Sequence, residues 1–183
     1  MQHIYVVHGY TATPDSHWFP WLEQQCQMLP SVVFHRIQMP APDTPSLEPW
    51  LKTLEATIQI KPSTILIGHS LGCITLLRYL AHTQQRIRGL FLVAGFCEPL
   101  KQFPELDEFV NTLLPCAQLL QQAETRVMIY SDNDPVVPPS LSLNLAQQLD
   151  MKRVEIPHAG HFVARHGITQ LPILWQLLRP LLL

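Results

Sequence analysis

The sequence predicts an α/β fold of three layers, in which a mainly parallel sheet lies between two layers of helices. Six short runs of apolar and β-branched residues have the length of strands, and longer stretches with helical spacing alternate with them. The central runs are apolar at consecutive positions, which is typical of parallel strands covered on both faces. This alternation along the whole chain favours one α/β/α sandwich.

The strands are expected, in chain order, at residues 4–7, 32–37, 64–67, 90–93, 127–130 and 154–156. Apolar stripes predict helices at residues 18–29, 47–58, 71–81, 141–149 and 168–178. Pro45 and Ser46 are suited to begin the second helix, and Pro138 and Pro139 lead into the fourth. Residues 96–122 contain three prolines, so we expect a loop with short helices there, one of them near residues 105–113, over the carboxyl edge of the sheet.

Length and composition indicate one globular domain over residues 1–183. The chain is 47% hydrophobic and 14% charged, has a formal net charge of -2, and contains no run of Lys and Arg, so a nucleic-acid partner is not expected. No apolar run reaches the roughly 18–20 residues of a membrane span. No export signal precedes the first strand, so we expect a cytoplasmic location. The four cysteines show no Cys-x-x-Cys spacing and are expected to be reduced.

The strongest functional signal is the sequence Gly68-His69-Ser70-Leu71-Gly72. It fits the pattern Gly-x-Ser-x-Gly and stands between a predicted strand and a predicted helix, where a sharp turn presents the serine hydroxyl. Glycine allows neighbouring backbone to approach closely, and the start of the following helix favours a developing negative charge. Ser70 is therefore the candidate nucleophile.

A nucleophilic serine needs a base and an acid that orients the base, in the chain order Ser, Asp, His for this kind of turn. Asp134 and Asp132 follow the fifth strand, and we favour Asp134 because Pro135 makes its backbone extended. Asp132 is then expected to bond its own turn. His161 and His158 follow the sixth strand, and His161 is the preferred base, with His158 as the alternative.

Such a mechanism also requires two backbone donors for an oxyanion. The amide of Leu71 and the amide of Tyr10, after the first strand, are the candidates. The His and Asp side chains named above are better explained as a triad than as a metal site. No glycine-rich phosphate loop is present, so no cofactor is expected.

The chain resembles the small serine hydrolases that include bacterial YdeN-type proteins and the vertebrate retinoblastoma-binding protein 9. The resemblance rests on Val7-His8-Gly9-Tyr10, His17-Trp18-Phe19-Pro20-Trp21-Leu22, Met39-Pro40, Ile67-Gly68-His69-Ser70-Leu71-Gly72, Ser131-x-x-Asp134-Pro135 and Gly160-His161-Phe162. His8-Gly9-Tyr10 and His17-Trp18 bring it closer to the bacterial branch. The resemblance implies Ser70, Asp134 and His161 as the triad, and a reduced α/β-hydrolase fold with strand order 2-1-3-4-5-6 and little or no cap domain.

These observations predict a serine hydrolase that acts on a small ester or other acyl substrate through an acyl-enzyme. The open site is expected to be lined by residues from the surrounding loops: Tyr10, Trp18, Phe96, Val136 and Phe162. Amide or peptide hydrolysis is the second hypothesis, and a non-catalytic interaction module on the same fold is the third.

Overall fold

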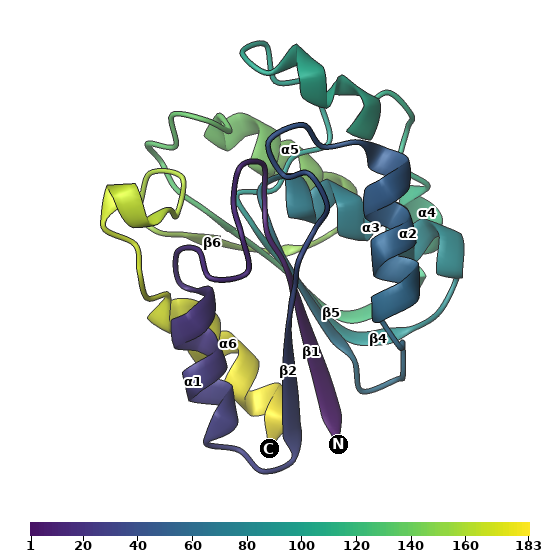
Figure 1. The fold of residues 1–183 in the computed structure, drawn as a ribbon, viewed down its shortest axis with the longest axis vertical. Helices are drawn as coiled ribbons and strands as arrows, with labels where there is room; N and C mark the ends of the chain where they lie inside the picture. The colour runs from purple at the N-terminus through teal and green to yellow at the C-terminus, as the bar shows by residue number, and fades with distance from the viewer.

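The computed structural model describes all residues from Met1 to Leu183 and contains one six-stranded sheet with helices on both faces (Figure 1). The strands are β1 (Gln2–Val7), β2 (Val32–Ile37), β3 (Ile65–His69), β4 (Ile87–Val93), β5 (Ala123–Tyr130) and β6 (Lys152–Glu155). The helices are α1 (Phe19–Gln27), α2 (Leu47–Thr57), α3 (Leu71–Thr83), α4 (Cys116–Gln122), α5 (Pro139–Gln148) and α6 (Pro172–Leu182). Two 3-10 helices, η1 (Pro104–Phe109) and η2 (Ala164–His166), lie in the loops.

The sheet has the order β2-β1-β3-β4-β5-β6, and every neighbouring pair of strands is parallel. The predicted fold class and strand order are confirmed. From β1 the chain first adds β2 on one side and then crosses over to add β3 on the other side. The connections therefore change direction between β1 and β3, where Val7 pairs with Gly68. Loops that leave the carboxyl ends of such strands separate, and ligands of open α/β sheets bind in the crevice between them.

The two faces of the sheet are buried under different helices, because successive strand residues point to opposite sides. In β1, Ile4 and Val6 belong to a cluster of 19 buried residues that also contains residues of α1 and α6. Tyr5 and Val7 belong to a cluster of 31 buried residues that includes residues of α2, α3, α4 and α5. The continuous apolar runs of the central strands follow from burial on both faces.

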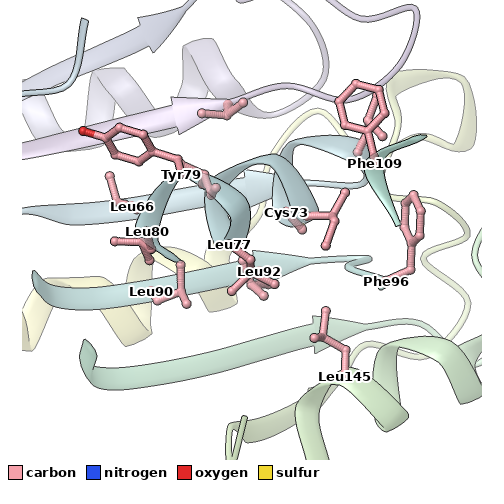
Figure 2. Packing of buried hydrophobic residues seen from close by; sticks show 14 of the residues in the cluster. Leu66, Cys73, Leu77, Tyr79, Leu80, Leu90, Leu92, Phe96, Phe109 and Leu145 are labelled. Atoms are coloured by element: carbon pink, nitrogen blue, oxygen red, sulfur yellow. The ribbon is translucent and has the colours of Figure 1, made fainter. Parts of the chain in front are cut away.

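Helix α3 is buried on nearly every side, and all its residues from Leu71 to Leu80 are buried. Leu77 and Leu80 belong to the same cluster as Leu90 of β4, and Figure 2 shows this packing. A central helix enclosed in this way is fixed by packing. Its first residue follows Ser70, so the packing also fixes the position of the candidate nucleophile.

Arg78 of α3 connects this helix to the segment above the sheet. Its guanidinium is nearly buried and donates hydrogen bonds to the carbonyl oxygens of Phe109, Thr112 and Leu113. The helix predicted near residues 105–113 is instead the shorter 3-10 helix η1, which ends at Phe109. The carbonyl groups of Phe109, Thr112 and Leu113 accept from Arg78 rather than from following amides. The segment is thereby held over the carboxyl edge of the sheet.

The last helix begins later than predicted. It starts at Pro172 rather than at residue 168, because Leu171 has non-helical backbone, with φ -134° and ψ 71°, and Pro172 occupies the first turn, where a missing N–H costs nothing. The helix continues past residue 178 to Leu182. None of the helices combines the length and the apolar composition that a bilayer span requires.

Candidate active site

Ser70 lies at the turn between β3 and α3, where its backbone has φ 53° and ψ -120°. This conformation is strained for a residue that carries a side chain. The Ser70 amide donates to the carbonyl oxygen of Val93 at 2.9 Å and holds the turn. A Cβ on Gly72 would lie 2.3 Å from the carbonyl oxygen of Val7, and one on Gly68 would lie 2.7 Å from the backbone of α3. Both glycines are therefore needed for the close approach of the chain.

The structure brings Ser70, His161 and Asp134 together from three separate loops. The Ser70 hydroxyl donates to Nε2 of His161 at 2.9 Å, and Nδ1 of His161 donates to Oδ2 of Asp134 at 2.8 Å. All three residues are buried. Because Nδ1 faces a carboxylate, the ring proton lies on Nδ1 and the lone pair of Nε2 faces the serine hydroxyl.

Asp134 is the acid next to His161, and its other oxygen fixes the loop. Oδ1 accepts hydrogen bonds from the amides of Val136 at 2.8 Å and Val137 at 3.0 Å. Asp132 accepts from the amide of His158 at 2.7 Å. The turn-bonding role that we expected for Asp132 therefore belongs to Asp134. His158, the alternative base, has an exposed side chain and does not reach Ser70.

The turn after β1 approaches Ser70 through a fixed histidine. Nε2 of His8 accepts from the amide of Met39 at 3.1 Å, so Nδ1 carries the proton and donates to the carbonyl oxygen of Gly9 at 2.8 Å. The Tyr10 amide, one of the two candidate oxyanion donors, has no partner in the protein. The amide of Leu71, the other candidate, stands in the first turn of α3, where helix amides have no intrahelical partner.

His69 lies behind the candidate base and holds its backbone. Its Nε2 donates to the carbonyl oxygen of His161 at 2.9 Å. Burial, with smaller contributions from the neighbouring imidazoles of His161 and His17, lowers the pKa of His69 well below its ordinary value of 6.5. The rings of Trp18 and Phe19 contact it edge-on. His69 is therefore a neutral donor that positions the loop of His161.

A cavity of about 350 Å³ opens beside Ser70 and His161. It is lined by residues at the ends of strands and in the five loops after β1, β3, β4, β5 and β6, including η1 and η2: Gly9, Tyr10, Thr11, Ala12, His17, His69, Ser70, Leu100, Phe103, Leu106, Val136, His161, Val163 and Arg165. No group of three or more His, Cys, Asp or Glu side chains converges in a way that could hold a metal ion. The polar residues at the cavity thus carry hydroxyl groups, imidazoles and one guanidinium, and backbone amides lie beside them.

Only part of the predicted lining was correct. Tyr10 and Val136 line the cavity, but Trp18, Phe96 and Phe162 are fully buried elsewhere and do not. The rings of Trp18 and Phe162 fill the apolar layer under α1 and α6, and the ring of Phe96 fills the opposite layer. A position in a loop next to a strand end was not sufficient to predict that these rings point inward.

The sequence analysis missed most of the residues that line the cavity. Leu100, Phe103 and Leu106 form an apolar wall. This wall belongs to the segment that the guanidinium of Arg78 holds over the sheet. His17 and Arg165 line the cavity as well. His17 begins one of the stretches that carry the family resemblance, so the sequence did offer a reason to consider it as a site residue. Nothing in the sequence pattern singled out Arg165.

The chain matches a known protein family along nearly its whole length. The family described as serine hydrolase matches residues 4–180. A relative from Bacillus subtilis (strain 168) named YdeN, described as a hydrolase, is 39% identical over 178 residues, which cover 96% of this chain and 93% of the relative. The rat protein described as serine hydrolase RBBP9 is 27% identical over 79% of this chain and 77% of its own length.

The structural comparison agrees with the comparison of sequences. The crystal structure of the YdeN protein of B. subtilis superposes with a TM-score of 0.94 at 38% sequence identity. The match covers 99% of this chain and 98% of the YdeN chain. The six-stranded architecture and the loops that carry Ser70, Asp134 and His161 therefore lie within the superposed part of the fold.

Proposed function

The chain belongs to the serine hydrolase family, and from this premise we propose that it hydrolyses a small ester or other acyl substrate. Ser70 is the nucleophile, His161 the general base and Asp134 the acid that orients the base. The observation that carries the proposal is the continuous pair of hydrogen bonds, 2.9 Å from Ser70 to His161 and 2.8 Å from His161 to Asp134. Such an arrangement is recognised by its geometry and the roles of its members.

The reaction proceeds in two halves. Nε2 of His161 takes the hydroxyl proton as Oγ of Ser70 attacks the acyl carbon, and Asp134 stabilises the imidazolium that forms. His161 then gives the proton to the leaving group, which departs and leaves the acyl group on Ser70. Water attacks this acyl-enzyme with His161 again as base, and the acid product is released.

Two features of the cavity support this chemistry. The unpaired amides of Tyr10 and Leu71 are suited to bind the oxyanion of each tetrahedral intermediate, where one such donor contributes about 100- to 1000-fold in rate. The cavity volume of about 350 Å³ fits a small substrate.

Ester hydrolysis is favoured over the removal of amino-terminal residues from peptides. An aminopeptidase-like activity needs an acidic group to bind the substrate amine. No Asp or Glu lines the cavity, and Asp132 is bonded to a backbone amide away from it. The lining therefore supports an acyl substrate without a free amine at the reacting end.

The test is the intact mass of the protein after treatment with a fluorophosphonate probe, which bonds to a serine activated by its neighbours. We expect one adduct on the wild type and none on Ser70→Ala. Folding of both proteins is checked by circular dichroism. If the folded wild type carries no adduct, the hydrolase mechanism is wrong, and a non-catalytic binding role takes its place.

A further inference from the structure

Two side chains at the cavity have no part in the proposed mechanism. His17, between β1 and α1, and Arg165, in η2, both line the cavity that also exposes Ser70. The loops that carry them are joined, because the amide of Ala164 donates to Nδ1 of His17 at 3.1 Å. His17 and Arg165 therefore belong to one wall of the cavity.

His17 presents a hydrogen-bond donor on this wall. Because Nδ1 accepts from a backbone amide, the neutral ring carries its proton on Nε2. Burial, with smaller contributions from the positive charges of His161 and Arg165, lowers the pKa of His17 to about 4. The ring is thus neutral near pH 7, and its Nε2–H has no acceptor in the protein.

The backbone of His17 is also in an unusual conformation. Its φ is 58°, in the left-handed region that few residues with a side chain adopt. The ring packs edge-on against His69 and Phe19, and the bond from Ala164 fixes its direction. Strained residues held by their surroundings cluster at functional sites, and this one lies in the wall of the cavity.

Arg165 is the only residue with a charged side chain in the cavity lining, apart from the histidines. Its guanidinium forms no ion pair and no hydrogen bond within the protein. It lies near His17, since its charge lowers the pKa of that ring. Two acidic groups outside the lining, Glu105 and Asp43, lie near the hydroxyl of Tyr10. The wall of His17 and Arg165 therefore offers donors and positive charge, with no carboxylate to neutralise it.

We propose that His17 and Arg165 form a subsite for a carboxylate on the substrate, so that the preferred substrates are esters that carry a negative charge. The inference rests on the proposed function, because it names the class of ester that Ser70 attacks. A guanidinium and an imidazole N–H both donate to a carboxylate, and hydrogen bonds that involve charge are the strong ones. The apolar wall of Leu100, Phe103 and Leu106 then contacts the uncharged part of the substrate.

The experiment compares kcat/KM for two pairs of esters. In the first pair the charge is in the acyl part: the p-nitrophenyl hemiester of glutarate against p-nitrophenyl valerate. In the second pair it is in the leaving group: 4-carboxyphenyl butyrate against 4-carbamoylphenyl butyrate. We expect the wild type to favour the anionic member of at least one pair about tenfold. The pair that shows the preference identifies the part of the substrate that carries the carboxylate.

Three variants assign that preference to the subsite. Arg165→Gln should lower the ratio of anionic to neutral kcat/KM about tenfold. His17→Asn should lower it severalfold, because Asn tolerates the left-handed backbone and can accept from Ala164 but lacks the Nε2 donor. Arg179→Gln removes the same charge from α6, away from the cavity, and should keep the wild-type ratio (Figure 1). A ratio near one for both pairs in the wild type, or an unchanged ratio in Arg165→Gln, overturns the proposal.

A binding measurement separates this proposal from the proposed function. In Ser70→Ala the esters stay intact, and calorimetry gives their dissociation constants directly. Tighter binding of an anionic ester than of its neutral partner, lost in Ser70→Ala/Arg165→Gln, supports the subsite even if the wild type hydrolyses neither ester. Equal binding of both members of each pair overturns the subsite even if the fluorophosphonate adduct establishes Ser70 as a nucleophile.

Discussion

Left-handed backbone occurs at both ends of the parallel strands, in different structural roles. The loops at the amino ends of the strands are here called the amino edge of the sheet, and those at the carboxyl ends the carboxyl edge. At the amino edge, Gln84 and Asp150 have positive φ and follow the ends of α3 and α5, where a left-handed residue commonly ends a helix. The other seven non-glycine residues with positive φ lie in loops after the carboxyl ends of strands: Thr11, His17, Ala41, Ser70, Ala94, His158 and Phe162. At the amino edge such residues follow the ends of helices, whereas three of those at the carboxyl edge, Thr11, His17 and Ser70, line the cavity.

Many of the buried polar side chains lie at the carboxyl edge. His8, His69, Ser70, Asp134 and His161 are buried at the carboxyl ends of strands, whereas Thr64 and Gln122 are buried at the amino edge. Below the carboxyl edge, two large clusters of buried hydrophobic residues fill the layers between sheet and helices. The layers supply the stability that lets one edge hold strained and desolvated groups. A protein that departs from local preferences in this way does so at its functional site.

The sharpest test of this comparison is Ser70→Gly. Glycine adopts φ 53° without strain. The free energy of unfolding of Ser70→Gly should therefore be about 1 kcal/mol higher than that of Ser70→Ala. Loss of Oγ should lower kcat for ester hydrolysis on the order of 10⁶-fold. Thermal unfolding and ester hydrolysis measure the two effects. If Ser70→Gly is less stable than Ser70→Ala, the serine turn is not strained.

Asp134→Asn tests whether the carboxyl edge orients the base. The amide oxygen can still accept from Val136 and Val137, but the amide nitrogen then faces Nδ1 of His161 and donates to it. The imidazole proton moves to Nε2, so the ring no longer accepts from the serine, and kcat should fall about 10⁴-fold.

Asp132→Asn is the matched control for this change. The carboxylate of Asp132 accepts a hydrogen bond from the backbone amide of His158 and lies 3.7 Å from Nδ1 of the His158 ring, whereas His161 is bonded to Asp134. Its replacement should change kcat less than tenfold. Steady-state kinetics on one chromogenic ester decide the matter, and equal losses in the two variants would show that both acids act only on the loops.

The histidines of the carboxyl edge predict sensitivity to acid. Burial lowers the pKa of His8 and His69, and burial with nearby positive charge lowers that of His17 to about 4. Between pH 6.5 and the lowered values, the unfolded chain binds protons that the folded chain does not. The free energy of unfolding should therefore fall as the pH falls through this range, and these groups should have no effect above it.

Urea unfolding at pH 7, 6 and 5 measures this loss. His69→Gln should reduce the pH dependence, because the Gln amide can still donate to the carbonyl oxygen of His161 but does not titrate. The variant should be less stable than the wild type at pH 7, where the packing of the ring is lost. A pH dependence equal to that of the wild type would place the acid sensitivity at other groups.

The sequence predicted the layers of this molecule better than its carboxyl edge. Strand β2 has the predicted bounds, residues 32–37, and the apolar runs of β3 and β4 identified the buried centre of the sheet. Periodicity reports which face of an element is buried, so it is informative where elements are regular. Ser70 was found because a strained turn of this kind requires glycines on either side, and these are visible in the sequence.

The cavity could not be predicted in the same way. Trp18 and Phe162 stand in loops but fill the apolar layers, whereas His17 and Arg165 line the cavity. The direction of a loop side chain depends on the backbone angles of the loop and on distant partners, such as the amide of Ala164 for His17. Neither follows from a periodic pattern. The sequence predicts which loops follow the strands and in what order. It does not predict which side chains of these five loops point into the cavity.

The smallest effect is expected from Gln84→Gly at the amino edge. Gln84 has φ 54° and follows the last turn of α3 with an exposed side chain, and glycine is the residue best suited to that position. The free energy of unfolding should rise by about 0.5–1 kcal/mol. Hydrolysis should stay at the wild-type rate, because the residue lies at the opposite edge from Ser70. The same relief of strain would thus remove activity at one edge and leave it intact at the other. If Gln84→Gly also impairs hydrolysis, the two edges are coupled through α3, which begins directly after Ser70, the proposed nucleophile, and ends at Gln84.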